Sequence, residues 1–271
     1  MNNLHRELAP ISDAAWADLE EEARRTFRRH VAGRRVVDVV GPEGVRLSAV
    51  GTGHLQPAEP PVSGVIARTR RSQPIVELRA PFTVDRQQVD AVERGAKDAD
   101  WQPVKDAARQ LALAEDRVIF DGYSAAGVIG LRAASSHPAI PLPADVPGYP
   151  GAVSRAMSAL RLAGVDGPYS LALGADAYTA VSEATDHGYP IREHIARVLG
   201  GEIIWAPAVD GAVLLSTRGG DFELHIGQDV SIGYLDHDDA AVQLYFQETL
   251  TFLAYTAEAV VTLPPASSPP A

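Results

Sequence analysis

The sequence predicts an α+β fold, in which helices and antiparallel strands occupy different stretches of the chain. Two stretches in the first half carry apolar residues at steps of three and four, which is the period of amphipathic helices. Residues 218–263 instead alternate apolar and polar side chains, the period of half-buried strands. Short helical and strand patterns alternate between these regions. The three observations together favour a helix-backed sheet with a second, mixed region inserted into the chain.

The first predicted element is an amphipathic helix that begins after Ser12, a residue type suited to capping the free N–H groups of a first turn. Gly33 is placed to end it. Its apolar positions recur on one side of the helix and are Trp16, Leu19, Ala23, Phe27 and Val31.

An extended arm is predicted from about Val45 to Val76. Strand-like residues on both sides enclose the proline-rich stretch QPAEPPVSG, which indicates a long two-stranded hairpin with a turn at its tip. A lone hairpin is only marginally stable in water, so we expect this arm to pack on a neighbouring subunit.

The remaining elements follow in order. Residues 85–122 are helical with a break between Gly95 and Pro103, and the proline-rich stretch SHPAIPLPADVPGYPG leads into the mixed region. That region has helices at about 152–162, 175–184 and 191–199 and strands at YSLALG, EIIWAPA and AVLLST. The residues LPPASSPPA at the end of the chain are predicted to be a disordered tail.

Glycines in RGGDFELHIGQDVSIGY, residues 218–234, raise the question of a phosphate or metal loop. A phosphate loop requires a helix after the glycines, and none is predicted here. The aspartates lack the alternate spacing of a calcium loop. We therefore interpret Gly219, Gly220 and Gly227 as turns between hairpin strands.

Composition excludes several function classes. The net charge of −11 and the isoelectric point near 5.1 argue against a nucleic-acid partner. The absence of cysteine excludes disulfides and thiolate chemistry. No apolar run reaches the length of a membrane span and no signal peptide precedes the first helix, so we expect a cytoplasmic protein without membrane contact.

No motif in the chain predicts catalysis. His187 and His194 are seven residues apart with Gly188 and Pro190 between them, which does not fit a zinc helix. Ser124 lacks the glycine spacing of a nucleophile elbow. We expect no catalytic residue, no metal and no cofactor, although binding of a small molecule such as a flavin is left open.

The order of elements is that of tailed-phage major capsid proteins, and particular stretches narrow the resemblance. The chain resembles the encapsulins, nanocompartment shell proteins related to linocin-type bacteriocins, in LAPISDAAWADLEEEARRTF, GRRVVDVVGPEG, PIVELRAPFTVDRQQVDAVERG, AGVDGPYSL, HGYPIREHI and RGGDFELHIGQDVSIGYLDHDDAAVQLYFQETLTF. The similarity runs from the first residues to about Leu263.

This resemblance implies a division of the chain. Residues 1–44 would hold the N-terminal helix and the start of a peripheral domain, 45–76 the extended loop, and 77–132 the peripheral domain with its spine helix. Residues 133–217 would form the axial domain, 218–263 the closing sheet of the peripheral domain, and 264–271 the tail.

The resemblance further implies a non-enzymatic shell of identical subunits, typically sixty. Its cargo would be a dye-decolourising peroxidase or a ferritin-like protein that carries a C-terminal targeting peptide. The residues at positions that match the family's cargo-peptide pocket are Phe27, Arg34, Asp38, Val39, Ile232 and Tyr234. Those at the fivefold pore are Asp186, His187, Gly188 and Tyr189.

Two other readings remain at this point. A prophage major capsid protein would share the fold, and a terminase or portal gene next to it would favour that reading. A secreted bacteriocin or protease-like protein is disfavoured by the missing signal peptide and catalytic triad. The sequence names neither the cargo nor the subunit number, pore size or gating.

Overall fold

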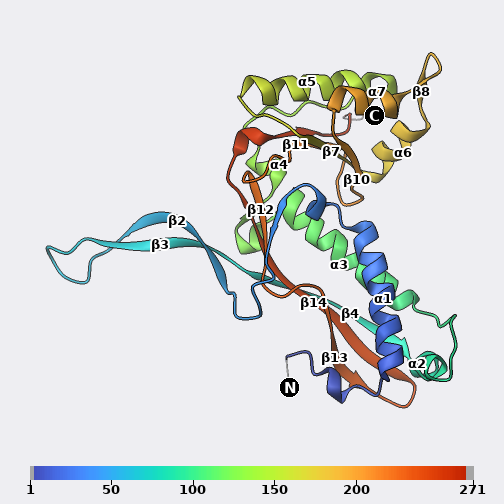
Figure 1. Ribbon diagram of the computed structural model, residues 1–271. Coiled ribbons are helices and arrows are strands. Elements are labelled where there is room, and N and C mark those ends of the chain that lie inside the picture. The colour runs from blue at the N-terminus through green and yellow to red at the C-terminus, as the bar shows by residue number, and fades with distance from the viewer. Residues whose placement is uncertain (1–2, 267–271) are drawn as a thin grey trace, which may run out of the picture.

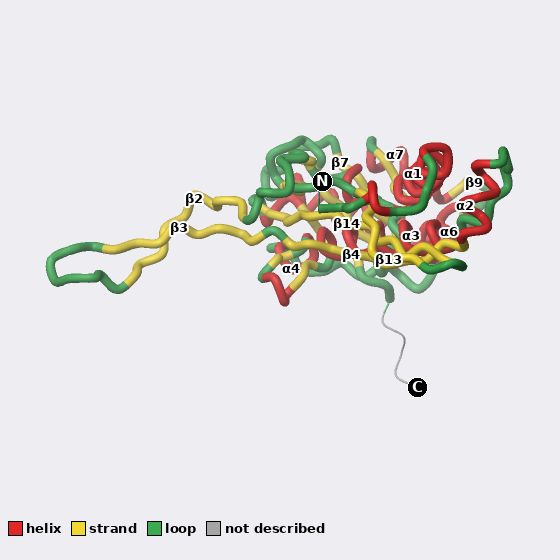
Figure 2. The backbone as a smooth tube through the Cα atoms, turned by 90° about the horizontal axis from the view of Figure 1, so that it is seen from below, coloured by secondary structure: helices red, strands yellow, loops and turns green. Residues whose placement is uncertain are grey.

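A computed structural model describes residues 3–266 of the chain. These residues form a five-stranded and a four-stranded sheet, each with its own helices, three two-stranded pairs, and one long arm, made by one of those pairs, that projects from the body (Figure 1). Seen from below, the arm still extends from one end of the body and packs along neither sheet (Figure 2).

The larger sheet has five strands, with β1, β12, β14 and β13 in that order and β4 on the other edge of β14. Helices α1 and α3 pack against each other and α3 also packs on β4. Ser12 caps α1 as predicted, since its Oγ accepts a hydrogen bond from the Ala15 N–H at 3.3 Å. The predicted helix break is confirmed, because the helical stretch divides into α2 and α3. The bounds are α1 Asp13–His30, α2 Arg86–Glu93, α3 Gln102–Phe120, β1 Asp38–Val40, β4 Val76–Asp85, β12 Phe222–Ile226, β13 Ser231–His237 and β14 Ala241–Ala254.

The strands β12 and β13 correct one prediction, because they do not form a hairpin with each other. Both pair antiparallel with β14, β12 along residues 250–254 and β13 along 242–247. They therefore follow one another along one edge of β14, and residues 227–230 bulge out between them. Gly219 and Gly220 do form a turn, with φ of 88° and 79°, whereas Gly227 belongs to this bulge. Its packing explains the glycine, since an added Cβ would lie 2.6 Å from Thr249 Oγ1.

The smaller sheet has four strands in the order β10, β7, β11 and β15. Helix α5 packs on β11 and β15, and α7 packs on α5 (Figure 1). Strand β15 pairs antiparallel with β11, so residues 260–263 return to this sheet. The predicted unit 218–263 therefore does not lie in one sheet. The bounds are β7 Tyr169–Leu173, β10 Glu202–Trp205, β11 Ala212–Ser216, β15 Val260–Leu263, α5 Tyr149–Leu162, α6 Ala175–Glu183 and α7 Ile191–Leu199.

The arm consists of β2, Ala49–Ala58, and β3, Ala67–Pro74, paired antiparallel. No residue of either strand is buried within the chain, and Ile66 beside its tip is 84 % exposed. The arm thus has apolar surface that a single chain leaves uncovered.

Short elements complete the described chain: η1 Arg6–Leu8, η2 Gly33–Arg35, β5 Gly122–Tyr123, η3 Ser124–Ala126, β6 Val128–Ile129, α4 Leu131–Ala134, η4 Val146–Gly148, β8 Thr185–Asp186, β9 Tyr189–Pro190 and η5 Ala257–Ala259. None of the helices in residues 3–266 is both long and apolar enough to cross a bilayer. Of the predicted tail, residues 267–271 lie outside the described residues. Pro264 is held in place, because its carbonyl accepts a hydrogen bond from the Leu142 N–H at 2.9 Å.

Candidate functional site

A groove of about 600 Å³ lies between α1, the bulge at 227–230 and the start of β13. One wall of the groove is a face of α1. Residues at steps of three and four along this helix lie on the same side and line the groove. Its floor is apolar and consists of Leu4, Ala23, Phe27, Val31, Val230, Ile232 and Phe246. Charged side chains surround this floor: Arg6, Glu20, Arg24, Arg28, Arg34, Arg35 and Asp229. An apolar floor with a charged rim suits a short segment of another chain.

Phe27 and Ile232 form the centre of the floor from two different elements. Phe27 lies in the last turns of α1 and is 6 % exposed, while Ile232 is the second residue of β13 and is 4 % exposed. The guanidinium of Arg34 lies 5.0 Å from the centre of the Phe27 ring. The apolar floor is therefore bordered by a positive charge at this end of the groove.

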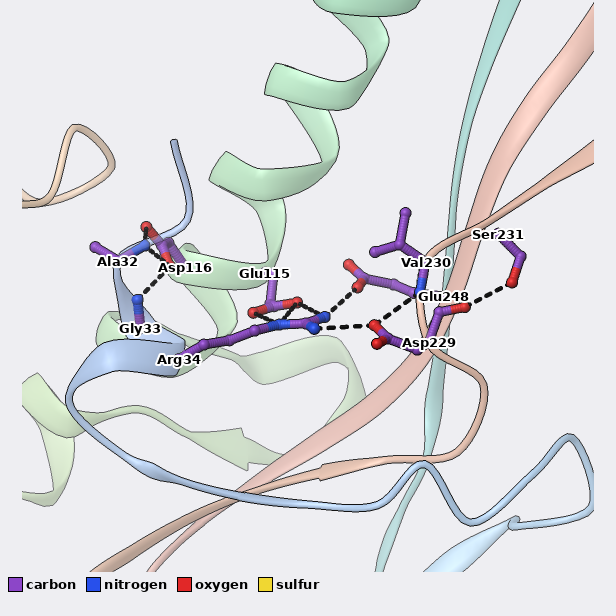
Figure 3. A network of polar contacts seen from close by, with 9 residues as sticks. All are labelled: Ala32, Gly33, Arg34, Glu115, Asp116, Asp229, Val230, Ser231 and Glu248. Atoms are coloured by element: carbon purple, nitrogen blue, oxygen red, sulfur yellow. Dashed lines mark hydrogen bonds and ion pairs between the residues drawn. The ribbon is translucent and has the colours of Figure 1, made fainter. Parts of the chain in front are cut away.

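A buried ionic network holds the far end of the groove (Figure 3). Arg34 donates to Glu115 from Nε at 2.8 Å and from Nη2 at 2.6 Å, and its Nη1 donates to Asp229 Oδ1 at 2.9 Å. Nη2 also lies 3.4 Å from Glu248 Oε2. The network thus joins η2, α3, β14 and the bulge through one guanidinium. Asp229 belongs to the bulge at 227–230, so its ion pair with Arg34 also holds the bulge in place as a wall of the groove.

The network contains more carboxyl groups than one cation neutralises. Burial raises the pKa of Glu248 well above its usual value, and the charge of Glu115 and a hydrogen bond with Glu115 raise it further. Burial opposes the charged form of Arg34, but hydrogen bonding to Glu115 and three nearby carboxylates raise its pKa overall. Arg34 therefore remains charged, while Glu248 favours its protonated form.

Asp116, next to Glu115 on α3, fastens the end of α1 to the spine helix. Its carboxylate accepts hydrogen bonds from the Ala32 N–H at 2.9 Å and the Gly33 N–H at 2.7 Å. Gly33 permits this close approach, because a Cβ there would overlap Ile119 and come within 3.1 Å of Asp116 Oδ1. Burial raises the pKa of Asp116 to about 7, although these two backbone hydrogen bonds act in the opposite direction.

Replacing Asp116 with asparagine is expected to flatten the pH dependence of stability. The pKa of the Asp116 carboxyl is 3.8 in an unfolded chain and about 7 in the folded protein. Between these pH values the folded protein therefore binds one proton that the unfolded chain has released. Stability should therefore fall as pH rises through that window, by on the order of 4 kcal/mol in total for this group. Thermal unfolding midpoints across the window measure the slope. Asp106→Asn, on an exposed position of the same helix, is the matched control, and an unchanged slope in Asp116→Asn would contradict the account.

The predicted pocket residues divide into two groups. Phe27, Arg34 and Ile232 line the groove, whereas Asp38, Val39 and Tyr234 do not. Asp38 lines a separate cavity of about 180 Å³ and accepts a hydrogen bond from the Gly220 N–H at 2.6 Å. Val39 is on β1 opposite Leu224 and is 43 % exposed. The hydroxyl of Tyr234 lies 2.6 Å from His237 Nδ1.

Sequence reasoning did not anticipate the carboxyl groups of the network. Glu115 falls in step with the apolar positions Leu111 and Val118 of its helix, and both Glu115 and its neighbour Asp116 are fully buried. Acids on the core face of a helix signal buried partners, a cation or backbone N–H groups, because buried polar groups require pairing. Glu248 gives the same signal within the buried run of β14.

The four residues predicted to line a pore lie together at a hairpin tip. Asp186 ends β8 and Tyr189 begins β9, while His187 and Gly188 form the turn between them. His187 has φ of 47°, its side chain is 97 % exposed, and its Nε2 lies 3.6 Å from Asp186 Oδ1. Within residues 3–266, no group of three acidic or histidine side chains is arranged to hold a metal ion.

Comparison with known proteins assigns the chain to a family. A family model described as encapsulating protein for peroxidase matches residues 1–251. The chain belongs to this family. The type 1 encapsulin shell protein of Rhodococcus erythropolis is 68 % identical over 97 % of this chain and 100 % of its own. Those of Mycobacterium tuberculosis and Brevibacterium linens are 62 % and 59 % identical, each over 97 % of this chain and 99 % of their own.

A solved structure supports the fold over the same span. The virus-like particle from Pyrococcus furiosus aligns with a TM-score of 0.64 over 92 % of this chain and 98 % of its own, at 16 % identity. The capsid of the empty GTA particle aligns with a TM-score of 0.55 over 86 % of this chain and 89 % of its own, at 15 % identity. The predicted phage major capsid fold is confirmed. The family match and the relatives, rather than these distant structures, identify the chain as an encapsulin shell protein, a structural protein and not an enzyme.

Proposed function

We propose that this chain assembles into a closed shell and retains a peroxidase inside it through the groove beside α1. The observation that carries the proposal is the groove itself, with Phe27 and Ile232 on its floor and Arg34 at its end. A peptide that adds its aliphatic side chains to this floor would be held by burial of apolar surface. The family description names a peroxidase as the encapsulated protein, which supports that cargo. A ferritin-like cargo would need the same kind of targeting peptide.

The arm supports the assembly part of the proposal. No residue of its two strands is buried, and they would gain buried area by lying against another subunit. The chain has lysine only at positions 97 and 105 and asparagine only at 2 and 3, none of them in the arm. The arm therefore has no lysine or asparagine through which neighbouring subunits could be crosslinked. Non-covalent contact area between subunits would stabilise the shell.

Gel filtration of the shell with a peroxidase carrying its own C-terminal segment tests cargo retention. Co-elution of both proteins at shell size is expected. Deletion of the segment should leave the peroxidase in the low-molecular-mass fractions. Retention of the truncated peroxidase would contradict a peptide-directed groove.

The hairpin residues Asp186, His187, Gly188 and Tyr189 are proposed to line a pore where several subunits meet. A ring of exposed Asp186 and His187 side chains would place charged and polar groups at the opening and so affect passage of ions.

Exchanging both Asp186 and His187 for alanine is expected to change the rate at which a charged substrate reaches an enclosed enzyme. The exposed side chains at the tip would no longer contribute charge to the opening. Turnover of an anionic and a neutral substrate by loaded shells, at several pH values, measures this. Equal rates in the variant and the original protein for both substrates would rule out pore lining by these residues.

A further inference from the structure

Two arginines on the rim of the groove differ from the others in having no acidic partner among residues 3–266. Arg6 pairs with Glu20 at 2.6 Å, Arg34 pairs with Glu115, and Arg35 pairs with Glu202 at 3.0 Å. Arg24 and Arg28 also line the groove and are exposed. Neither has an ion pair with any side chain in the described part of the chain.

The helical spacing places these two charges side by side. Arg24 and Arg28 are four residues apart on α1, so their side chains lie one turn apart on the same face. Ala23 and Phe27, which precede them, belong to the apolar floor. The groove thus offers an apolar surface bordered by two free guanidinium groups. This local positive charge is unusual in a chain with a net charge of −11.

From this arrangement we infer that the groove selects targeting segments that combine aliphatic side chains with carboxylate groups. The inference rests on the proposed function of the groove. An apolar segment alone would bury the floor but leave both guanidinium groups unpaired. A segment that carries aspartate, glutamate or its own terminal carboxylate would pair with them, and a lysine-rich segment would be repelled.

A library of random twelve-residue tails tests this preference. The tails are fused to the C-terminus of a fluorescent protein, co-expressed with the shell, and sequenced from the purified loaded shells. We expect retained tails to be rich in aliphatic residues and to contain an excess of aspartate and glutamate. The Arg24→Glu/Arg28→Glu shell should instead retain tails with an excess of lysine and arginine.

The neighbouring arginines supply a matched control. Arg25 and Arg29 are exposed on the same helix but do not line the groove, so Arg25→Glu/Arg29→Glu makes the same change in net charge. This variant should keep the acidic preference of the original shell. A preference that follows total charge, and reverses in both double variants, would overturn the inference.

Peptide affinities give the size of the effect. For a retained acidic tail, replacing its carboxylates with amides should weaken binding roughly three- to tenfold, because two exposed ion pairs are lost. Fluorescence anisotropy with assembled shells at low and high salt measures this, and the difference should shrink at high salt.

The outcomes separate the inference from the proposed function. If no tail is retained above the level of an Ile232→Asp shell, the groove does not bind cargo and the proposed function fails. If aliphatic tails are retained without charge preference, only the inference fails. Retention that disappears after nuclease treatment would show that the arginines attract nucleic acid, which would also overturn the inference.

Discussion

Replacing Arg34 with alanine is expected to lower the free energy of unfolding by about 3–5 kcal/mol, the cost of leaving buried charge without its partner. Glu115 and Glu248 are fully buried, and Arg34 is the cation that both contact. Denaturation of the protein at neutral pH, followed by circular dichroism, measures the change.

Arg35→Ala is the matched control for this variant. Arg35 follows Arg34 directly, but its ion pair with Glu202 joins side chains that are 52 % and 68 % exposed. Its loss should cost less than about 1 kcal/mol. Adding Glu115→Gln and Glu248→Gln to Arg34→Ala should recover part of the lost stability, because neutral amides then replace the buried carboxyl groups that have lost their cation. Equal losses for Arg34→Ala and Arg35→Ala would contradict the role given to the network.

Replacing Ile232 with aspartate is expected to reduce cargo retention at least tenfold. Ile232 lies on the groove floor, and the change places a carboxylate beneath the aliphatic side chains of the targeting segment, which opposes their burial there. Shells co-expressed with a fluorescent protein that carries a targeting segment provide the measurement, as bound fluorescence per shell.

Two further variants separate binding from folding. Leu235→Asp adds the same charge to the same strand at a half-exposed position outside the groove, and it should retain cargo. Ile232→Ala is milder and should weaken retention without loss of particles. Electron microscopy is used to check that shells form in each case. Normal loading of intact Ile232→Asp shells would show that the groove does not bind the cargo segment.

Much of the fold was predictable because its signals are local. The cap at Ser12, the periodicity of α1 and the break between α2 and α3 depend on residues close together in the sequence. The long hairpin was also predictable, since two strand patterns flank a proline-rich turn. The prediction that failed concerned which strands pair with each other when they are distant in the sequence. Strands β12 and β13 look like a hairpin by their spacing, but β14 is long enough to pair with both in succession.

The candidate site shows the same limit. Phe27 and Ile232 could be identified by position, and the structure brings them to one groove. Asp38, Val39 and Tyr234 lie outside it, and Asp38 lines a separate cavity instead. The network around Arg34 joins residues from four elements. Such a combination depends on tertiary packing, so the sequence signals that the buried acids need a partner but does not identify Arg34 as that partner.

The assembly claim is tested most directly by size-exclusion chromatography with negative-stain electron microscopy of the purified chain. We predict uniform hollow particles that elute at the size of a multi-subunit shell. A protein that remains a monomer or dimer across several salt and pH conditions would contradict the account.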